Sequence, residues 1–167
     1  MATVAPVVVA VLNASALVGA KNRIALQIAM NRRQFIGIWS PWIIEEMART
    51  LTWHWARQRG ISVEAKHALS VSAKLMMDIL TDTFIAVDPK PPHPPAWPEL
   101  RDAGDWPIWA TAKLAEARYV VSENTRDFPP RDAMGRHAWE GITYLTTADF
   151  LAQIEGGKVT PPPAPPP

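Results

Sequence analysis

Residues 7–12, Val-Val-Val-Ala-Val-Leu, form an unbroken apolar run in which four of the six residues are valine. A strand with one face in water alternates apolar and polar side chains, and this run shows no such alternation. The pattern is typical of a central strand that helices cover on both faces. It therefore favours a sheet that is buried within the molecule and mostly parallel.

The rest of the chain alternates between segments typical of helices and segments typical of strands. Further strands are expected at residues 35–39, 84–87, 119–122 and 141–145, and helices at residues 24–30, 41–59, 63–80, 105–117 and 147–154. Alternation of this kind implies right-handed crossovers between parallel strands. The predicted fold class is α/β, a three-layer sandwich around a central, mostly parallel sheet of about five strands.

The helix at residues 41–59 has clear start and stop signals. Ser40 can cap the free amides of the first turn, and proline suits the first helical position, which Pro41 occupies. Gly60 is a natural stop. One face of this helix is expected to pack into the core, because its apolar residues recur at helical spacing. They are Ile44, Met47, Ala48, Leu51 and Trp55.

A length of 167 residues fits one ordinary domain, which we expect to cover residues 1–155. Residues 156–167 end in Pro-Pro-Pro-Ala-Pro-Pro-Pro and are predicted to form a flexible tail. The chain has no cysteine, which excludes disulfides and thiolate metal sites and fits a cytoplasmic location. The apolar stretch at residues 4–20 is too short and interrupted to cross a membrane or direct export.

The overall charge of the chain does not indicate a nucleic-acid partner, because 17 basic residues are balanced by 16 acidic ones. An RNA surface would therefore be a local patch. The first half supplies one group of basic residues, which is either a phosphate-binding patch or an ordinary solvated face. The group consists of Arg23, Arg32, Arg33, Arg49, Arg57, Arg59 and Lys66.

Ligands of parallel sheets bind beyond the carboxyl ends of the strands, and several polar residues are expected there. They are Asn13 after the first strand, Glu46 in the next long helix, Asp105 at a later helix start, and Ser122, Glu123, Asn124 and Asp127 after the strand at 119–122. Carboxylates that converge from separate elements repel one another unless a cation lies between them. Mg²⁺ or Mn²⁺ suits such oxygen ligands and can activate water against a phosphodiester.

Each of these residues also has an ordinary structural role open to it. Asp105 precedes Trp-Pro and is a good helix cap, while Glu46 suits the solvent edge of its helix. Asp127 can form a turn before Phe-Pro-Pro, and Asn13 can cap the turn from strand to helix. Taken one at a time, the residues do not distinguish these roles from a catalytic one.

Four segments, in order, resemble the motifs of the PIN-domain family of ribonucleases. Residues 7–18 resemble the opening motif, a strand that ends in aspartate, followed by a small residue and then Asn or Ser. Residues 40–47 resemble the second motif, residues 102–112 the third and residues 117–129 the fourth. The segment 141–151 is similar to the closing strand and helix, so the resemblance spans roughly residues 7–154.

The resemblance implies a metal-dependent endoribonuclease that uses Mg²⁺ or Mn²⁺ on RNA, often as the toxin of a toxin–antitoxin pair. By the same resemblance, Glu46, Asp105 and Asp127 would hold the metal or its waters, and Ser122 and Asn124 would support them. Glu45 is the alternative to Glu46, and Asp102 is the alternative to Asp105, because the family motifs can be aligned to this chain in registers that differ by one residue or one helical turn.

One position departs from the family pattern, since Asn13 stands where the family has aspartate. An amide oxygen can coordinate a cation but brings no negative charge, so metal affinity and water activation should fall. Three explanations stay open. The chain is a pseudo-nuclease, an active variant that recruits another carboxylate such as Glu123, or an engineered inactive form.

Two other functions compete with an impaired nuclease. The first is a non-catalytic module on the same scaffold that binds RNA or a protein. The second is an α/β nucleotide-binding domain, which the absence of any Walker or Gly-x-Gly-x-x-Gly loop disfavours. The helix with Met76 and Met77 and the segment Trp53-His54-Trp55 are candidate surfaces for an antitoxin or a second copy, and a homo-oligomer is expected.

Overall fold

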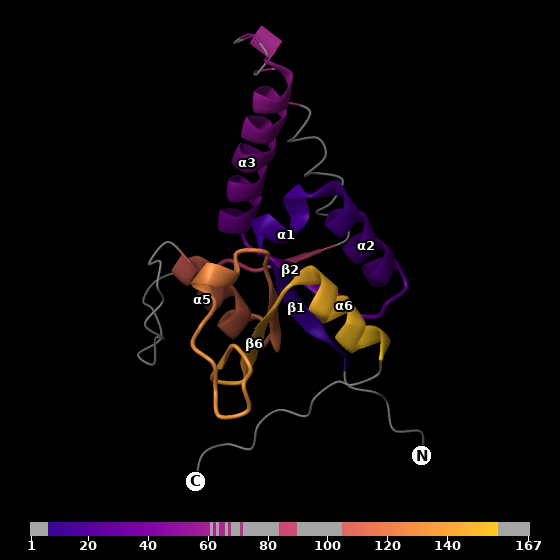
Figure 1. The fold of residues 1–167 in the computed structure, drawn as a ribbon, viewed down its shortest axis with the longest axis vertical. Helices are drawn as coiled ribbons and strands as arrows, with labels where there is room; N and C mark the ends of the chain where they lie inside the picture. The colour runs from indigo at the N-terminus through magenta and orange to yellow at the C-terminus, as the bar shows by residue number, and fades with distance from the viewer. Residues whose placement is uncertain are drawn as a thin grey trace.

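A six-stranded sheet in the order β3-β2-β1-β4-β6-β5 forms the centre of the computed structural model (Figure 1). The structure describes residues 7–60, 84–89 and 105–156, with the single positions 62, 64, 65, 67 and 71. The strands are β1 (Val9–Leu12), β2 (Ile36–Trp39), β3 (Ile85–Ala86), β4 (Tyr119–Val121), β5 (Ala138–Trp139) and β6 (Ile142–Leu145). The described helices are α1 (Ala14–Val18), α2 (Ala20–Asn31), α3 (Pro41–Arg59), α5 (Trp106–Leu114) and α6 (Thr147–Glu155), with a 3₁₀ turn η2 (Thr125–Asp127).

The α/β fold class predicted from the sequence is confirmed. All strand pairs are parallel except β5 with β6, which is antiparallel. The sheet has six strands rather than about five because β5 was not expected. With only the two residues Ala138 and Trp139, this strand is too short to show an alternating pattern in the sequence.

Strand β1 lies in the middle of the sheet, as its unbroken apolar run predicted. It pairs with β2 on one side and β4 on the other, and Ala10, Val11 and Leu12 are fully buried. Helices α2 and α6 cover one face of the sheet, and α5 lies on the other (Figure 1). Helices on both faces exclude water from β1, which explains why this strand needs no polar side chain.

The helix expected at residues 24–30 lies within α2, and a short helix that was not expected, α1, precedes it and meets it at Gly19. Gly19 is extended (φ −70°, ψ 121°), so the backbone leaves the helical conformation there. The guanidinium of Arg23 donates to the carbonyls of Leu17 (2.8 Å) and Val18 (3.3 Å), the last residues of α1. Arg23 therefore stabilises the end of α1, and this contact engages one cation of the basic group noted in the sequence.

Helix α3 begins and ends as its signals predicted. The Ser40 hydroxyl accepts a hydrogen bond from the Ile43 amide (3.4 Å), and Gly60 adopts the left-handed conformation (φ 56°) that glycine favours. Met47 and Leu51 are fully buried on the expected face. The Trp55 side chain, most of the helix expected at 63–80, the proline-rich loop and the tail after Gly156 lie outside the described residues.

Helix α6 begins at Thr147, as expected, and the Thr146 hydroxyl caps it by accepting from the Asp149 backbone amide (3.2 Å). The tryptophans divide between two environments. Trp39 and Trp109 are fully buried, whereas Trp42 and Trp53 are 50% and 68% exposed. Of the described helices, none is both long enough and apolar enough to cross a membrane.

Replacing Gly37 with alanine should lower the free energy of unfolding by about 1–3 kcal/mol, the usual cost of overfilling a packed core. An added Cβ would lie 2.5 Å from the Met30 sulfur and 2.9 Å from the Phe84 ring. The Phe84 ring cannot move freely, since it stacks on Trp39 with ring centres 3.9 Å apart. Urea unfolding measures the effect, and Gly19→Ala is the matched control because no atom lies within 4 Å of its added Cβ. Equal stability of the two variants would contradict this account of β2 packing.

Candidate nuclease site at the carboxyl ends of strands β1 and β4

Strands β1 and β4 are neighbours in the sheet although more than 100 residues separate them in the chain. The chain leaves β1 toward β2 on one side, while β4 and β6 lie on the other side. This divergence is a topological switch point, where open α/β sheets hold their ligands. The pairing of Leu12 with Val121 brings Asn13 next to Ser122. The backbone amide of Asn13 donates to the Val121 carbonyl (2.9 Å).

Asn13 is buried at this point, and both ends of its side-chain amide are engaged. Its Oδ1 accepts from the Ala14 amide (2.7 Å), and its Nδ2 donates to the Ser122 hydroxyl (3.2 Å). The Ala14 contact fixes the orientation of the side chain, because only oxygen can face a backbone N–H. The capping role expected of Asn13 is therefore real, and the residue fills it at the candidate site itself.

Ser122 connects Asn13 to the loop that follows β4. Its Oγ accepts from Asn13 and from the Asn124 amide (3.2 Å), which uses both acceptor positions of the hydroxyl. Its own proton must then go to the Ser15 Oγ, 3.0 Å away. Ser15 also accepts from the Glu123 backbone amide (3.1 Å), so these five residues form one hydrogen-bond network in which Asn13 is a donor.

Asp127 joins the same network through Asn124. The Asn124 side-chain amide donates to Asp127 Oδ2, and the Asp127 backbone amide donates to the Asn124 carbonyl (3.2 Å). Both side chains are half-buried in the turn that carries η2. The structure thus brings together Asn13, Ser122, Asn124 and Asp127, all of which the family resemblance singled out.

Asp105 and Glu46 belong to two different helices, Asp105 at the start of α5 and Glu46 within α3. Asp105 directly precedes α5, but its side chain makes no capping hydrogen bond to that helix, so the simple cap interpretation is wrong. Burial raises the pKa of Tyr144 in β6 well above its usual range, and the negative charge of Asp105 raises it further. Glu46 is half-buried on α3.

A small cleft of about 200 Å³ lies between the start of α3 and the start of α5. Its lining includes Trp42, Glu45, Asp88 and Trp106. Glu45 is exposed and faces this cleft, whereas its neighbour Glu46 is half-buried, so both positions remain open for the glutamate of the second motif. Asp102, the alternative to Asp105, lies outside the described residues.

The donor atoms of these residues suit a hard divalent cation, but their placement supplies few of its ligands. Within the described ranges, no three acidic or histidine side chains gather into a metal-binding group. Position 13 offers an amide whose oxygen already accepts from Ala14. Mg²⁺ is often held by one or two carboxylates, with waters and substrate phosphates completing its shell. The described side chains therefore supply oxygen ligands of the right kind without forming an assembled metal group.

Glu123, considered from the sequence as a replacement carboxylate, has another contact. Its Oε1 accepts from the Thr147 amide (2.9 Å) in the first turn of α6. A carboxylate at this helix end is stabilised by the free amides and by the helix dipole. In this conformation Glu123 supports α6 and does not complete the Asn13 site.

Ser15 is the member of the network that we did not select as a site residue from the sequence. The opening motif contained the signal, because the family has Asn or Ser two residues after its aspartate. The structure shows why a short polar residue is needed there: Ser15 joins Ser122 to the Glu123 amide.

Comparison with known families supports the assignment that the geometry suggests. The chain matches the PIN domain over residues 7–126, more than half of its length. The chain belongs to the PIN domain family. The match covers strands β1–β4 and extends to Arg126, one residue before Asp127. A search of curated protein sequences found no match.

Membership of this family indicates the general type of module that the chain forms. PIN domains are nuclease-type modules that generally use divalent metal ions. The resemblance noted from four ordered motifs is thus confirmed at the level of the family and its fold. The departure at Asn13 and the toxin role are finer statements that the match does not address.

Proposed function

We propose that this PIN domain is a metal-dependent endoribonuclease whose cleavage is weakened by Asn13. The observation that carries the proposal is the hydrogen-bonded cluster at the β1/β4 switch point, which joins Asn13, Ser122, Asn124 and Asp127. These are the first and fourth family motifs, and they meet at the position where this fold class holds its ligands. The family match supports the same conclusion independently.

The residues of the chain have distinct parts in the proposed reaction. Glu46, Asp105 and Asp127 would hold Mg²⁺ or Mn²⁺ with its waters, and the bound ion would supply an activated water and offset phosphate charge. Ser122 and Asn124 position Asp127 and the end of β1 through their hydrogen bonds. Asn13 holds the strand-to-helix turn but contributes no negative charge, and this is the physical reason for weak cleavage.

The second candidate is a non-catalytic PIN module that binds RNA or a protein. The engagement of both ends of the Asn13 amide favours it. An asparagine whose donor and acceptor are both matched fits its surroundings without a metal. The two candidates differ in one measurable property, which is whether Mn²⁺ supports turnover of RNA.

The proposal predicts that Asp127→Asn lowers Mn²⁺-dependent cleavage of a fluorogenic RNA by at least about tenfold, the effect of removing a charge-assisted contact. The reason is that Asp127 is the carboxylate most firmly held in the cluster. Glu155→Gln removes one negative charge from an exposed position at the end of α6 and should leave the rate unchanged. Mn²⁺ binding is followed by electron paramagnetic resonance with and without a non-cleavable RNA.

Several outcomes discriminate between the candidates. Loss of activity in Asp127→Asn but not in Glu155→Gln supports the nuclease. Equal activity in both variants would show that the cleavage arises elsewhere. RNA binding without turnover or Mn²⁺ uptake would favour the non-catalytic module.

The remaining expectations from the family resemblance stay predictions. They are a toxin role, an antitoxin partner, a homo-oligomer and a cytoplasmic location. One observation bears on the partner surface, since Trp53 on α3 is 68% exposed. A large aromatic side chain at that exposure is a common anchor in protein interfaces.

A further inference from the structure

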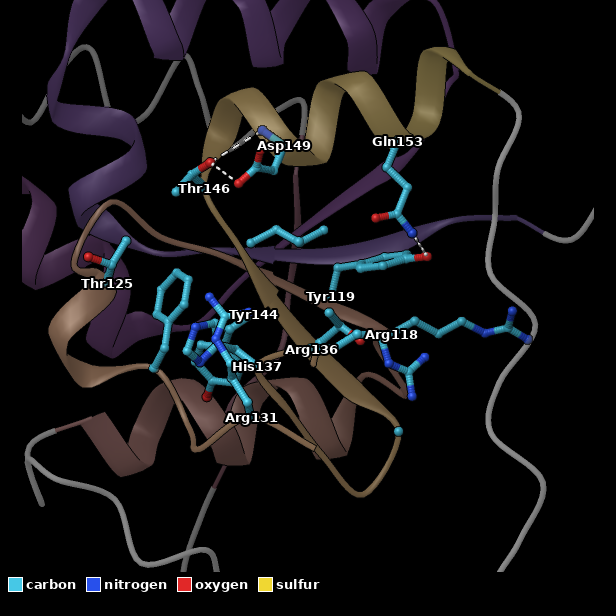
Figure 2. A pocket seen from close by; sticks show the side chains of 14 residues that line it. Arg118, Tyr119, Thr125, Arg131, Arg136, His137, Tyr144, Thr146, Asp149 and Gln153 are labelled. Carbon is cyan, nitrogen blue, oxygen red and sulfur yellow. Dashed lines mark hydrogen bonds between the residues drawn. The ribbon is translucent and has the colours of Figure 1, made fainter. Parts of the chain in front are cut away.

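A cavity of about 510 Å³ lies along β6, between α6 and the segment that follows η2 (Figure 2). Its walls come from β4, β6, α6 and residues 125–137. None of the residues assigned to the candidate nuclease site lines this cavity. The two lie close together, because Thr125 of the lining is next to Asn124 and the charge of Asp105 acts on Tyr144 of the lining. No motif of the sequence analysis predicted this cavity.

The lining carries an excess of positive charge from Arg118, Arg131 and Arg136. Arg136 is paired with Asp132, at 2.8 Å from Nη2 to Oδ2. Arg131 donates only to the uncharged Gly135 carbonyl, and no acidic side chain among the described residues pairs with Arg118. Two guanidinium groups therefore lack a compensating charge.

The one acidic side chain in the lining, Asp149, is stabilised within its own helix. It accepts from the Thr146 hydroxyl (2.9 Å) in the first turn of α6, where the helix dipole favours a negative charge. Figure 2 shows this pair at the α6 side of the pocket, away from Arg131 and His137. The rest of the lining remains available for an anion.

His137 presents one free ring nitrogen, and its tautomer follows from a single contact. Its Nδ1 lies 2.7 Å from the Pro129 carbonyl, which can only accept, so Nδ1 carries a proton. The other nitrogen, Nε2, has no partner among the described residues. His137 also pairs with Arg131 in an antiparallel bridge, which sets the two side chains next to each other.

Tyr119 adds a neutral donor beside the arginines. Burial is the main cause that raises the pKa of the Tyr119 phenol, and the positive charges of Arg118 and Arg136 act in the opposite direction. The hydroxyl accepts from Gln153 Nε2 (3.0 Å) and keeps its own proton for another acceptor. Figure 2 shows Arg118, Arg136, Tyr119 and Gln153 at one end of the pocket.

We propose that this pocket binds a nucleotide through its phosphate group, either a free mononucleotide or the phosphorylated end of an RNA chain. Guanidinium groups match the geometry of phosphate oxygens, and neutral donors such as Tyr119 complete an anion shell. The lining also has three aromatic rings that can contact a base, since Phe128 meets His137 edge-on at 5.4 Å and Tyr144 edge-on at 5.6 Å. The volume falls within the range of about 300–1,000 Å³ typical of small-molecule sites. The proposal does not depend on nuclease activity.

The test is isothermal titration calorimetry in EDTA, which prevents metal-dependent cleavage. Adenosine 5′-monophosphate and inorganic phosphate are compared with adenosine, and a 5′-phosphorylated adenosine pentanucleotide is compared with its unphosphorylated form. Arg118→Gln should raise the Kd for adenosine 5′-monophosphate by at least about tenfold, the worth of one charged hydrogen bond. Lys21→Gln, at an exposed position in the first turn of α2 and outside the pocket lining, is the charge-matched control and should bind like the original chain.

The arms of this experiment separate the two sources of phosphate. Tight binding of the mononucleotide alone supports a free nucleotide, and preference for the phosphorylated pentanucleotide supports an RNA end. The proposal is overturned if no phosphate-bearing probe binds, if adenosine binds as tightly as its monophosphate, or if Arg118→Gln and Lys21→Gln have equal effects. Thermal unfolding of Arg118→Gln confirms that the variant is folded.

Discussion

Replacing Asn13 with aspartate should raise Mn²⁺-dependent RNA cleavage roughly 10- to 100-fold, the range that changes at metal-site residues typically produce. The variant keeps the cap, because one carboxylate oxygen can accept from the Ala14 amide as Asn13 Oδ1 does. The other oxygen faces the Ser122 hydroxyl, which can turn its proton from Ser15 to the new acceptor. The fold is therefore retained while the site gains a negative charge.

Two further variants make this result specific. Asn13→Ala removes both the cap and the polar group, so it should lose about 1 kcal/mol of stability without gaining activity. The double variant Asn13→Asp with Asp127→Asn should lose the gain, which excludes a contaminating ribonuclease. Equal rates for the original chain and Asn13→Asp would show that position 13 does not limit catalysis, and the nuclease proposal would lose its explanation of this residue.

Phe150→Ala should cause the largest loss of stability, about 3–5 kcal/mol, the usual cost of truncating a buried phenylalanine. Phe150 is fully buried on α6, where its ring meets Phe35 edge-on at 4.9 Å and Tyr119 at 5.6 Å. These contacts attach α6 to the rest of the core. Domains of this size are stable by only about 5–15 kcal/mol, so the variant approaches the limit of folding.

Urea unfolding followed by circular dichroism measures this effect. Leu114→Ala on α5 is the control, since Leu114 is 55% exposed and its truncation should change stability by less than about 0.5 kcal/mol. The loss of unfolding free energy in Phe150→Leu should lie between those of Phe150→Ala and Leu114→Ala. If Phe150→Ala and Leu114→Ala unfolded at the same urea concentration, α6 would not be held by this aromatic cluster.

Local signals accounted for most of the fold. The apolar run of β1 indicated that both faces of the strand are buried. The caps of α3 at Ser40 and Gly60 depend only on residues a few positions away in the sequence. Such features depend on nearby chemistry and can be predicted from the sequence. The short helix α1 was not expected, because the Arg23 contact that stabilises its end is not a standard capping pattern.

The candidate site was predictable only where pairing between strands follows from the fold class. Asn13 and Ser122 meet because each follows a neighbouring parallel strand. The basic pocket was not predictable, since Arg118, Arg131 and His137 come together through the hairpin of β5 with β6. A two-residue strand leaves no periodic pattern, so the sequence contained no sign that these side chains converge.

The two ends of the sheet bear on how this protein can assemble. Both outermost described strands, β3 and β5, have only two residues. Edge strands this short offer few unpaired backbone N–H and C=O groups. Natural proteins use short edge strands to avoid pairing with other chains. Growth of the sheet across a molecular boundary is therefore disfavoured, and we expect a second copy or a partner protein to dock on helical surfaces instead.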